Sequence, residues 1–143
     1  MSEIKVDTLT GKTTAGDITV TSEGGAATMQ LQQGLAKCFI NFNGTGTSAT
    51  EVVTSRDSFN VASHSDEGTG KYTITFTNAF NNDDYVGSGL SRTPGVLSGG
   101  TAQFPSTADS NQTTSSVEHY TINTGGSQAD YSHNHVIIHG DLA

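Results

Sequence analysis

The chain has 143 residues and a formal net charge of −8, and 32% of its residues are hydrophobic, with no Trp. Binding of nucleic-acid phosphates needs clustered cations, and the chain has only 6 Lys and Arg residues, so we expect no nucleic-acid partner. The small hydrophobic fraction predicts a thin core that oligomerisation would complete, and no apolar run is long enough for membrane insertion.

The first 25 residues predict a short β stalk. Residues 4–6 and 17–20 alternate apolar and polar side chains, and neither segment could bury its apolar face within one chain. Several chains sharing one core would bury both. Gly24 and Gly25 then end the pattern. We therefore expect residues 1–25 to form an intertwined β stalk.

Residues 26–37 predict a short helix. Ala27, Leu31 and Leu35 recur at the spacing of one helical face, and Gln and Thr residues surround them. A helix of this length is marginal in water by itself, and a parallel bundle of three chains would stabilise it. We expect these three side chains to drive trimerisation. The alternative is that the helix only caps the following domain.

Residues 38–143 predict an antiparallel β-sandwich head. Tyr72, Ile74 and Phe76 alternate with polar residues, and an acidic, Gly-rich turn at residues 66–70 connects this strand to the preceding one as a hairpin. Further strands are expected at residues 39–43, 56–63, 71–77, 116–124 and 133–139, with a looser region at 85–97. Residues 78–116 are polar and Gly-rich, which predicts long exposed loops.

The hairpin at residues 56–80 and the preceding segment 37–47 resemble the C-terminal domain of tail-fibre proteins from marine and cyanobacterial phages. Residues 1–10 are similar to the virion-proximal end of the same proteins. The chain departs from the usual pattern in three places. Cys38 and Phe39 stand where an Ala-Trp pair is common, residues 49–55 look inserted, and His139 replaces an aromatic residue.

This resemblance implies a structural protein of the phage particle, made in the host cytoplasm and located in the virion. It implies a homotrimeric short tail fibre that binds other tail or capsid proteins through its N-terminus and a host cell-surface glycan or protein through its head. The alternatives are a capsid-decorating head fibre or a tail adaptor with no receptor role. A virion-associated polysaccharide-processing enzyme belongs to another class. No catalytic motif supports it, so we expect no enzyme and no catalytic residues.

Two sets of residues are candidates for binding. Within the predicted loops, Tyr85, Arg92 and Phe104 could stack on or hydrogen-bond to a host glycan. His133 and His135 alternate on a predicted strand, so both rings project to one face, and three chains would supply six nitrogen ligands for a transition metal. Some phage fibre tips carry such His-x-His metal sites, which this segment resembles in spacing. Otherwise we expect no cofactor, and the alternative is that both histidines are simply solvated.

Overall fold

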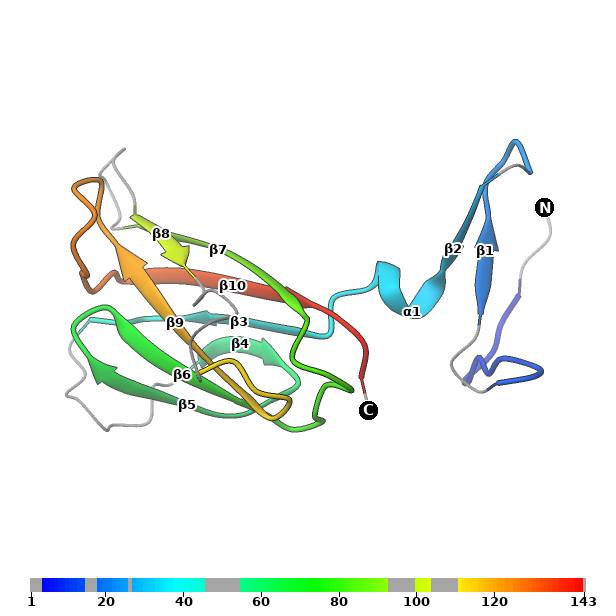
Figure 1. The fold of residues 1–143 in the computed structure, drawn as a ribbon, viewed down its shortest axis with the longest axis horizontal. Helices are drawn as coiled ribbons and strands as arrows, with labels where there is room; N and C mark the ends of the chain where they lie inside the picture. The colour runs from blue at the N-terminus through cyan, green and yellow to red at the C-terminus, as the bar shows by residue number, and fades with distance from the viewer. Residues whose placement is uncertain are drawn as a thin grey trace. The chain divides into compact units, whose positions relative to one another are not determined.

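The computed structural model describes residues 4–14, 18–25, 27–45, 55–92, 100–103 and 111–142. The chain divides into two compact units, Met1–Leu35 and Ala36–Ala143. Among the described residues, the first unit contains a two-stranded sheet and the second an eight-stranded sheet (Figure 1). All strand pairs within these described ranges are antiparallel, so the mainly β, antiparallel fold predicted from the sequence is confirmed.

The first unit is built on a short hairpin. Strand β1 (Thr19–Thr21) pairs with β2 (Thr28–Gln30), and the Ser22 amide donates a hydrogen bond to the Ala27 carbonyl at 2.8 Å. Gly25 takes a φ of 71° in the turn, a conformation that side chains disfavour. Gly24 and Gly25, which end the apolar and polar alternation in the sequence, therefore lie in the turn of this hairpin.

The helix predicted for residues 26–37 is wrong over most of its length. Residues 28–30 form β2, and α1 (Leu31–Gly34) is a single turn. The Leu31 amide donates to the Ile18 carbonyl at 2.7 Å, so strand pairing satisfies backbone groups that a longer helix would use. Ala27 and Leu35 are exposed and Leu31 is half-buried. These three residues therefore share no helical face, and trimerisation through a helical bundle loses its basis.

The second unit is a sheet with the strand order β4-β3-β10-β7-β8-β9-β6-β5. Its strands are β3 (Cys38–Phe42), β4 (Ser55–Phe59), β5 (Val61–Gly68), β6 (Lys71–Phe76), β7 (Val86–Arg92), β8 (Gly100–Gln103), β9 (Ser116–Ile122) and β10 (His133–His139). The predicted hairpin is confirmed for β5 and β6, but the strand predicted at residues 56–63 breaks at Asn60, and its first part belongs to β4. The prediction of loops throughout residues 78–116 is wrong where β7 and β8 run, because Gly and Ser in these strands concealed their alternation.

The two edge strands of this sheet are consecutive in the chain. β4 lies at one edge and β5 at the other, and only Asn60 separates them. Asn60 has a φ of 58°, which Asn tolerates better than most residues. Its side-chain oxygen accepts from the Asn78 amide at 2.7 Å, and its side-chain nitrogen donates to the Asn78 carbonyl at 3.0 Å. The sheet must therefore curl until its two edges approach each other (Figure 1).

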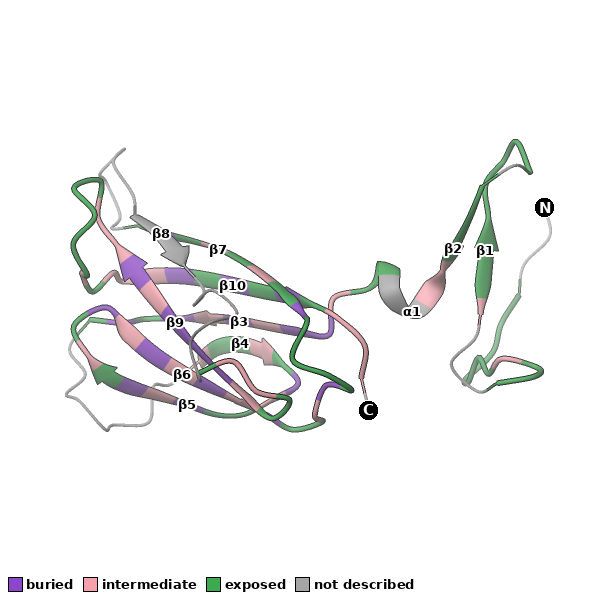
Figure 2. Ribbon diagram, viewed as in Figure 1, coloured by how far each residue is buried: buried purple, intermediate pink, exposed green. Residues whose placement is uncertain are grey.

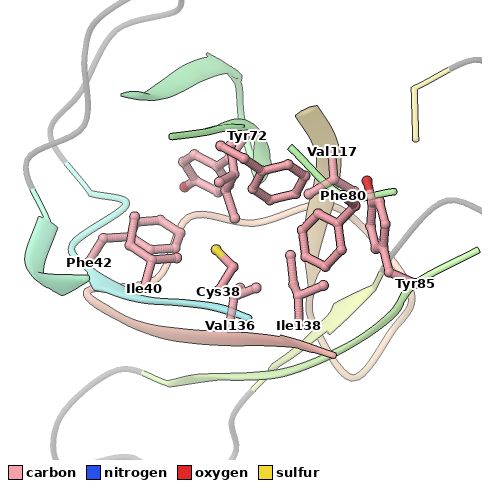
Figure 3. Packing of buried hydrophobic residues seen from close by; sticks show 11 residues of the cluster. Cys38, Ile40, Phe42, Tyr72, Phe80, Tyr85, Val117, Val136 and Ile138 are labelled. Carbon is pink, nitrogen blue, oxygen red and sulfur yellow. The ribbon is translucent and has the colours of Figure 1, made fainter. Parts of the chain in front are cut away.

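Curling encloses one apolar core. Buried and more exposed residues alternate along β6 and β10, as the period-two pattern predicts (Figure 2). Figure 3 shows side chains of β3 and β10 facing those of β6 and β9 across this core. The buried hydrophobic cluster consists of Cys38, Ile40, Phe42, Tyr72, Ile74, Phe76, Phe80, Tyr85, Val117, Val136 and Ile138.

One carboxylate connects three parts of the second unit near the end of the β5–β6 hairpin. Asp130 accepts hydrogen bonds from the Gly70 amide at 2.6 Å and from the Tyr72 hydroxyl at 3.0 Å. The same hydroxyl lies 3.0 Å from the Gly44 carbonyl. Gly70 has a φ of 63° and lies too close to backbone atoms of Thr121 and Ala129 for a side chain to fit. Substituting Gly70 would therefore disturb this connection.

We predict that the backbone conformation and the side-chain bonds of Asn60 contribute separately to stability. Asn60→Ala should lower the free energy of unfolding by about 2–4 kcal/mol, because Ala disfavours this φ and makes neither bond. Asn60→Gly loses the same bonds but accepts the φ, and should cost about 1–2 kcal/mol. Urea denaturation measures both. Equal losses for the two variants would show that the φ of Asn60 has no energetic role.

Candidate functional site

The solvent side of four neighbouring strands, β4, β3, β10 and β7, forms what we call the outer face. Along β10, Asn134, Val136 and Ile138 are buried, so His133, His135, Ile137 and His139 point outward. The structure thus confirms that the two predicted metal-ligand histidines share one face. It also shows that this face lies away from the core of the chain.

Strand register arranges the outer face in rows. Ile137 lies opposite Phe39 on one side and Ser88 on the other, while His135 lies between Asn41 and Leu90. A further outward ring, Phe59 on β4, stacks on Phe39 with 6.0 Å between ring centroids and 22° between planes. One apolar row therefore runs from Phe59 through Phe39 to Ile137, and Leu90 of β7 lies diagonally across from Ile137.

These rows enclose a shallow cavity of about 310 Å³, which we call the outer groove. Its outward-pointing lining side chains are Phe39, Asn41, Ser88, Leu90, His135 and Ile137. Leu90 is 67% exposed and Ile137 is 39% exposed. Water-exposed hydrophobic side chains gathered around a hollow are typical of binding sites, and a few polar groups among them would orient a ligand.

One end of the outer face carries positive charge, and we call Arg56, Arg92 and His133 the basic corner. Arg92 lies opposite His133 in the register of β7 and β10. Arg56 reaches over β3 and donates hydrogen bonds to the carbonyls of Phe42 at 2.9 Å and Ser132 at 2.7 Å. Partial desolvation lowers the pKa of His133, and the neighbouring charges of Arg56, Arg92 and His135 lower it further. The positive charge of the corner therefore comes from its two arginines, because the lowered pKa favours the neutral form of His133.

The predicted metal site has only two adjacent rings within one chain. His133 Nδ1 lies 3.2 Å from the Ser132 hydroxyl oxygen. Among the described residues, no group of three or more His, Cys, Asp and Glu side chains is close enough to hold a metal ion. A site shared by three chains would need each β10 to face a common axis. Metal binding by His133 and His135 stays a prediction on that condition.

The host-contact residues predicted from the sequence fall in different places. Tyr85 is 5% exposed, packs 4.5 Å from Phe80 between ring centroids, and its hydroxyl donates toward the carbonyls of Thr113 and Ser116, each at 3.0 Å. Its assignment as a receptor contact is therefore wrong, because the ring lies in the core. Arg92 is exposed on the outer face. Phe104 lies outside the described residues.

The core contains two histidines that sequence reasoning missed. His64 on β5 is 2% exposed and His119 on β9 is fully buried, and their rings stack with 5.6 Å between centroids. His119 follows Val117 by two residues, so strict alternation could have placed it on the inner face. Desolvation lowers the pKa of His64 to about 4, although Asp66 raises it slightly. Desolvation and repulsion from His64 hold the pKa of His119 well below its usual range.

The chain matches no family model, no curated protein and no solved structure. Within the described residues, no helix is both long enough and apolar enough to span a membrane. Function is therefore inferred from the residues themselves and from the surface that the fold builds from them.

We predict that acid destabilises the second unit through its buried histidines. Since the folded pKa of His64 is about 4, below the ordinary value near ~6.5, the unfolded chain binds more protons between these values. The stabilisation present above about pH 6.5 should therefore decline toward pH 4, with about 3 kcal/mol coming from His64 alone. Urea denaturation at several pH values measures this decline.

A matched pair of substitutions tests the assignment. His64→Leu should flatten the decline in the free energy of unfolding, with His119 accounting for part of the remainder. His139→Gln removes an exposed imidazole and should leave the decline unchanged. If His64→Leu retains the full pH dependence of the unmodified chain, His64 is not its source.

Proposed function

We propose that this chain is a structural protein of a phage particle, a homotrimeric short tail fibre. Its first unit would attach to other virion proteins, and its second unit, a curled β-sandwich head, would contact the host surface. The observation that carries this proposal is the outer face, with its exposed apolar rows, groove and basic corner. The resemblance of residues 1–10, 37–47 and 56–80 to phage tail fibres supports the same conclusion.

The exposed hydrophobic side chains of the first unit support association between chains. Its hairpin has two strands, and such a hairpin is marginally stable in water by itself. Exposed large hydrophobic residues of this unit are Ile4, Val6, Leu9, Val20, Met29 and Leu35. A unit this small cannot bury them in a core of its own, whereas neighbouring copies could cover them. The hairpin and its flanking residues thus replace the predicted helix as the proposed site of trimerisation.

Attachment to the head of the particle is the second candidate. An exposed apolar N-terminal unit would suit a capsid-decorating fibre or a tail adaptor equally well, because any virion protein could cover it. The outer face favours the host-attachment role, since a decorating protein needs no exposed groove. Electron microscopy of particles labelled with an antibody against this chain would locate it on the tail or on the capsid.

We predict that the unmodified chain is a trimer in solution by multi-angle light scattering. Val20 and Met29 are opposite each other in the hairpin, and both are exposed in the single chain. Replacing both with Ser should shift the mass toward that of a monomer, because each side chain buried in a trimer contributes about 1.5–3 kcal/mol. Val86→Ser, an exposed change on the second unit, is the control. A monomeric unmodified chain would refute the trimer.

We also predict that the purified chain competes with phage particles for adsorption to host cells. Leu90→Glu places a charge at the outer groove without touching the core and should abolish this competition. Thr124→Glu adds the same charge at the exposed turn after β9 and should leave it intact. Counting unadsorbed plaque-forming particles measures the effect. If the unmodified chain does not compete, the host-attachment role is wrong and a decorating role remains.

A further inference from the structure

The outer groove and the basic corner are continuous along β10. Ile137, His135 and His133 point outward in succession, and alternate residues of a strand are about 6.7 Å apart. Ile137 and His135 line the groove, while His133 belongs to the corner. A ligand about 13 Å long would therefore contact an apolar surface at one end and positive charge at the other.

Arg92 is the cation at this corner that is available to a ligand. Arg56 already donates to two backbone carbonyls, and its Nη1 also lies 3.4 Å from the Asn41 side-chain oxygen. Arg92 is exposed and makes no hydrogen bond or ion pair with other described residues. A guanidinium presents paired N–H donors that match the two oxygens of a carboxylate. One available Arg therefore suits a ligand with one carboxylate at that end.

The groove limits the size and character of the occupant. A volume of about 310 Å³ lies at the lower end of small-molecule sites, which corresponds to one or two sugar rings. Phe39, Leu90 and Ile137 provide an apolar surface for the C–H face of a pyranose. Asn41, Ser88 and His135 lie among them as hydrogen-bonding partners for hydroxyl groups. This mixture fits a saccharide better than a purely apolar ligand.

We propose that the outer groove binds a carboxylate-bearing saccharide, with a sugar ring on Phe39, Leu90 and Ile137 and the carboxylate at Arg92. This inference rests on the proposed host-attachment function, because it names the class of surface molecule that the head would recognise. The charge balance supports it. The chain carries −8 overall, so an acidic ligand would be repelled from most of its surface and attracted to the basic corner.

The test is isothermal titration calorimetry of the full chain with oligogalacturonate, a polymer of sugar acids. The neutral oligosaccharide maltohexaose is the matched ligand without carboxylates. We expect binding of oligogalacturonate only, weakening as salt is raised because salt screens the Arg92 contact. Equal binding of maltohexaose would overturn the requirement for a carboxylate. Absence of binding to oligogalacturonate would overturn the proposal.

Variants assign the two ends of the site. Arg92→Gln should weaken binding of oligogalacturonate about tenfold or more, since it removes a charge-assisted contact. Leu90→Ser should weaken it about fivefold by shrinking the apolar surface. Lys12→Gln removes an exposed positive charge from the first unit, and Val86→Ser removes an exposed side chain of β7 that does not line the groove. Neither control should change affinity, and a loss in the controls equal to that in the test variants would overturn the site.

Two further measurements separate this inference from the proposed function. Competition for phage adsorption without binding of oligogalacturonate would retain host attachment and overturn the ligand class. Binding of oligogalacturonate without competition would retain the site and overturn host attachment. If Leu90→Ser instead reduces the mass measured by light scattering, the outer face is a contact between copies, and the saccharide site is overturned.

Discussion

The one-residue connection at Asn60 between β4 and β5 determines how the sheet of the second unit curls. Strands that follow each other in sequence usually lie side by side, yet β4 and β5 occupy opposite edges of one sheet. A single residue cannot bridge two distant edges, so the edges must come together. The left-handed conformation of Asn60 permits the change of direction, and its two hydrogen bonds to the Asn78 backbone hold it.

Curling of the sheet gives the two sides of each strand different environments, a buried core and the solvent. Inward side chains of β3 and β10 join the apolar core, while outward side chains of these strands line the groove. The inner environment also contains His64 and His119, whose neutral forms it favours. It likewise raises the pKa of the Cys38 thiol to about 12, which makes the sulfur a poor nucleophile. On these strands, the side chains that solvent reaches are therefore those of the outer face.

The sequence predicted the strands better than it predicted the surface they create. Alternation at Tyr72, Ile74 and Phe76 depends on local geometry, so β6 and the hairpin were predictable. The helix prediction was wrong because residues 28–30 pair with β1 as a strand. The spacing of Ala27, Leu31 and Leu35 gives no information about that pairing. The polar neighbours of Tyr85 predict a loop at this position. The core position of its ring depends on Phe76 and Phe80, which the sequence alone does not place against it.

The groove could not have been predicted because it depends on register between strands that are far apart in sequence. Phe39, Leu90 and His135 become neighbours only when β3, β10 and β7 pair as they do. The alternation at His133 and His135 was visible, but the direction of that face and the approach of Arg92 were not. A single sequence indicates which side chains share a face of each strand. It does not indicate which strands become neighbours in the sheet.

The position of β3 bears on how the second unit would resist mechanical force. This strand is the first of the unit, it lies between β4 and β10, and the amide of Lys37 at its start donates to the Ile138 carbonyl at 2.9 Å. Tension applied to the preceding residues in the direction of β3 would pull this strand along its own axis. The hydrogen bonds to both neighbours would then be sheared together instead of breaking one after another. β4 and β10, which pair directly with β3 and contribute to the outer face, would carry that load first.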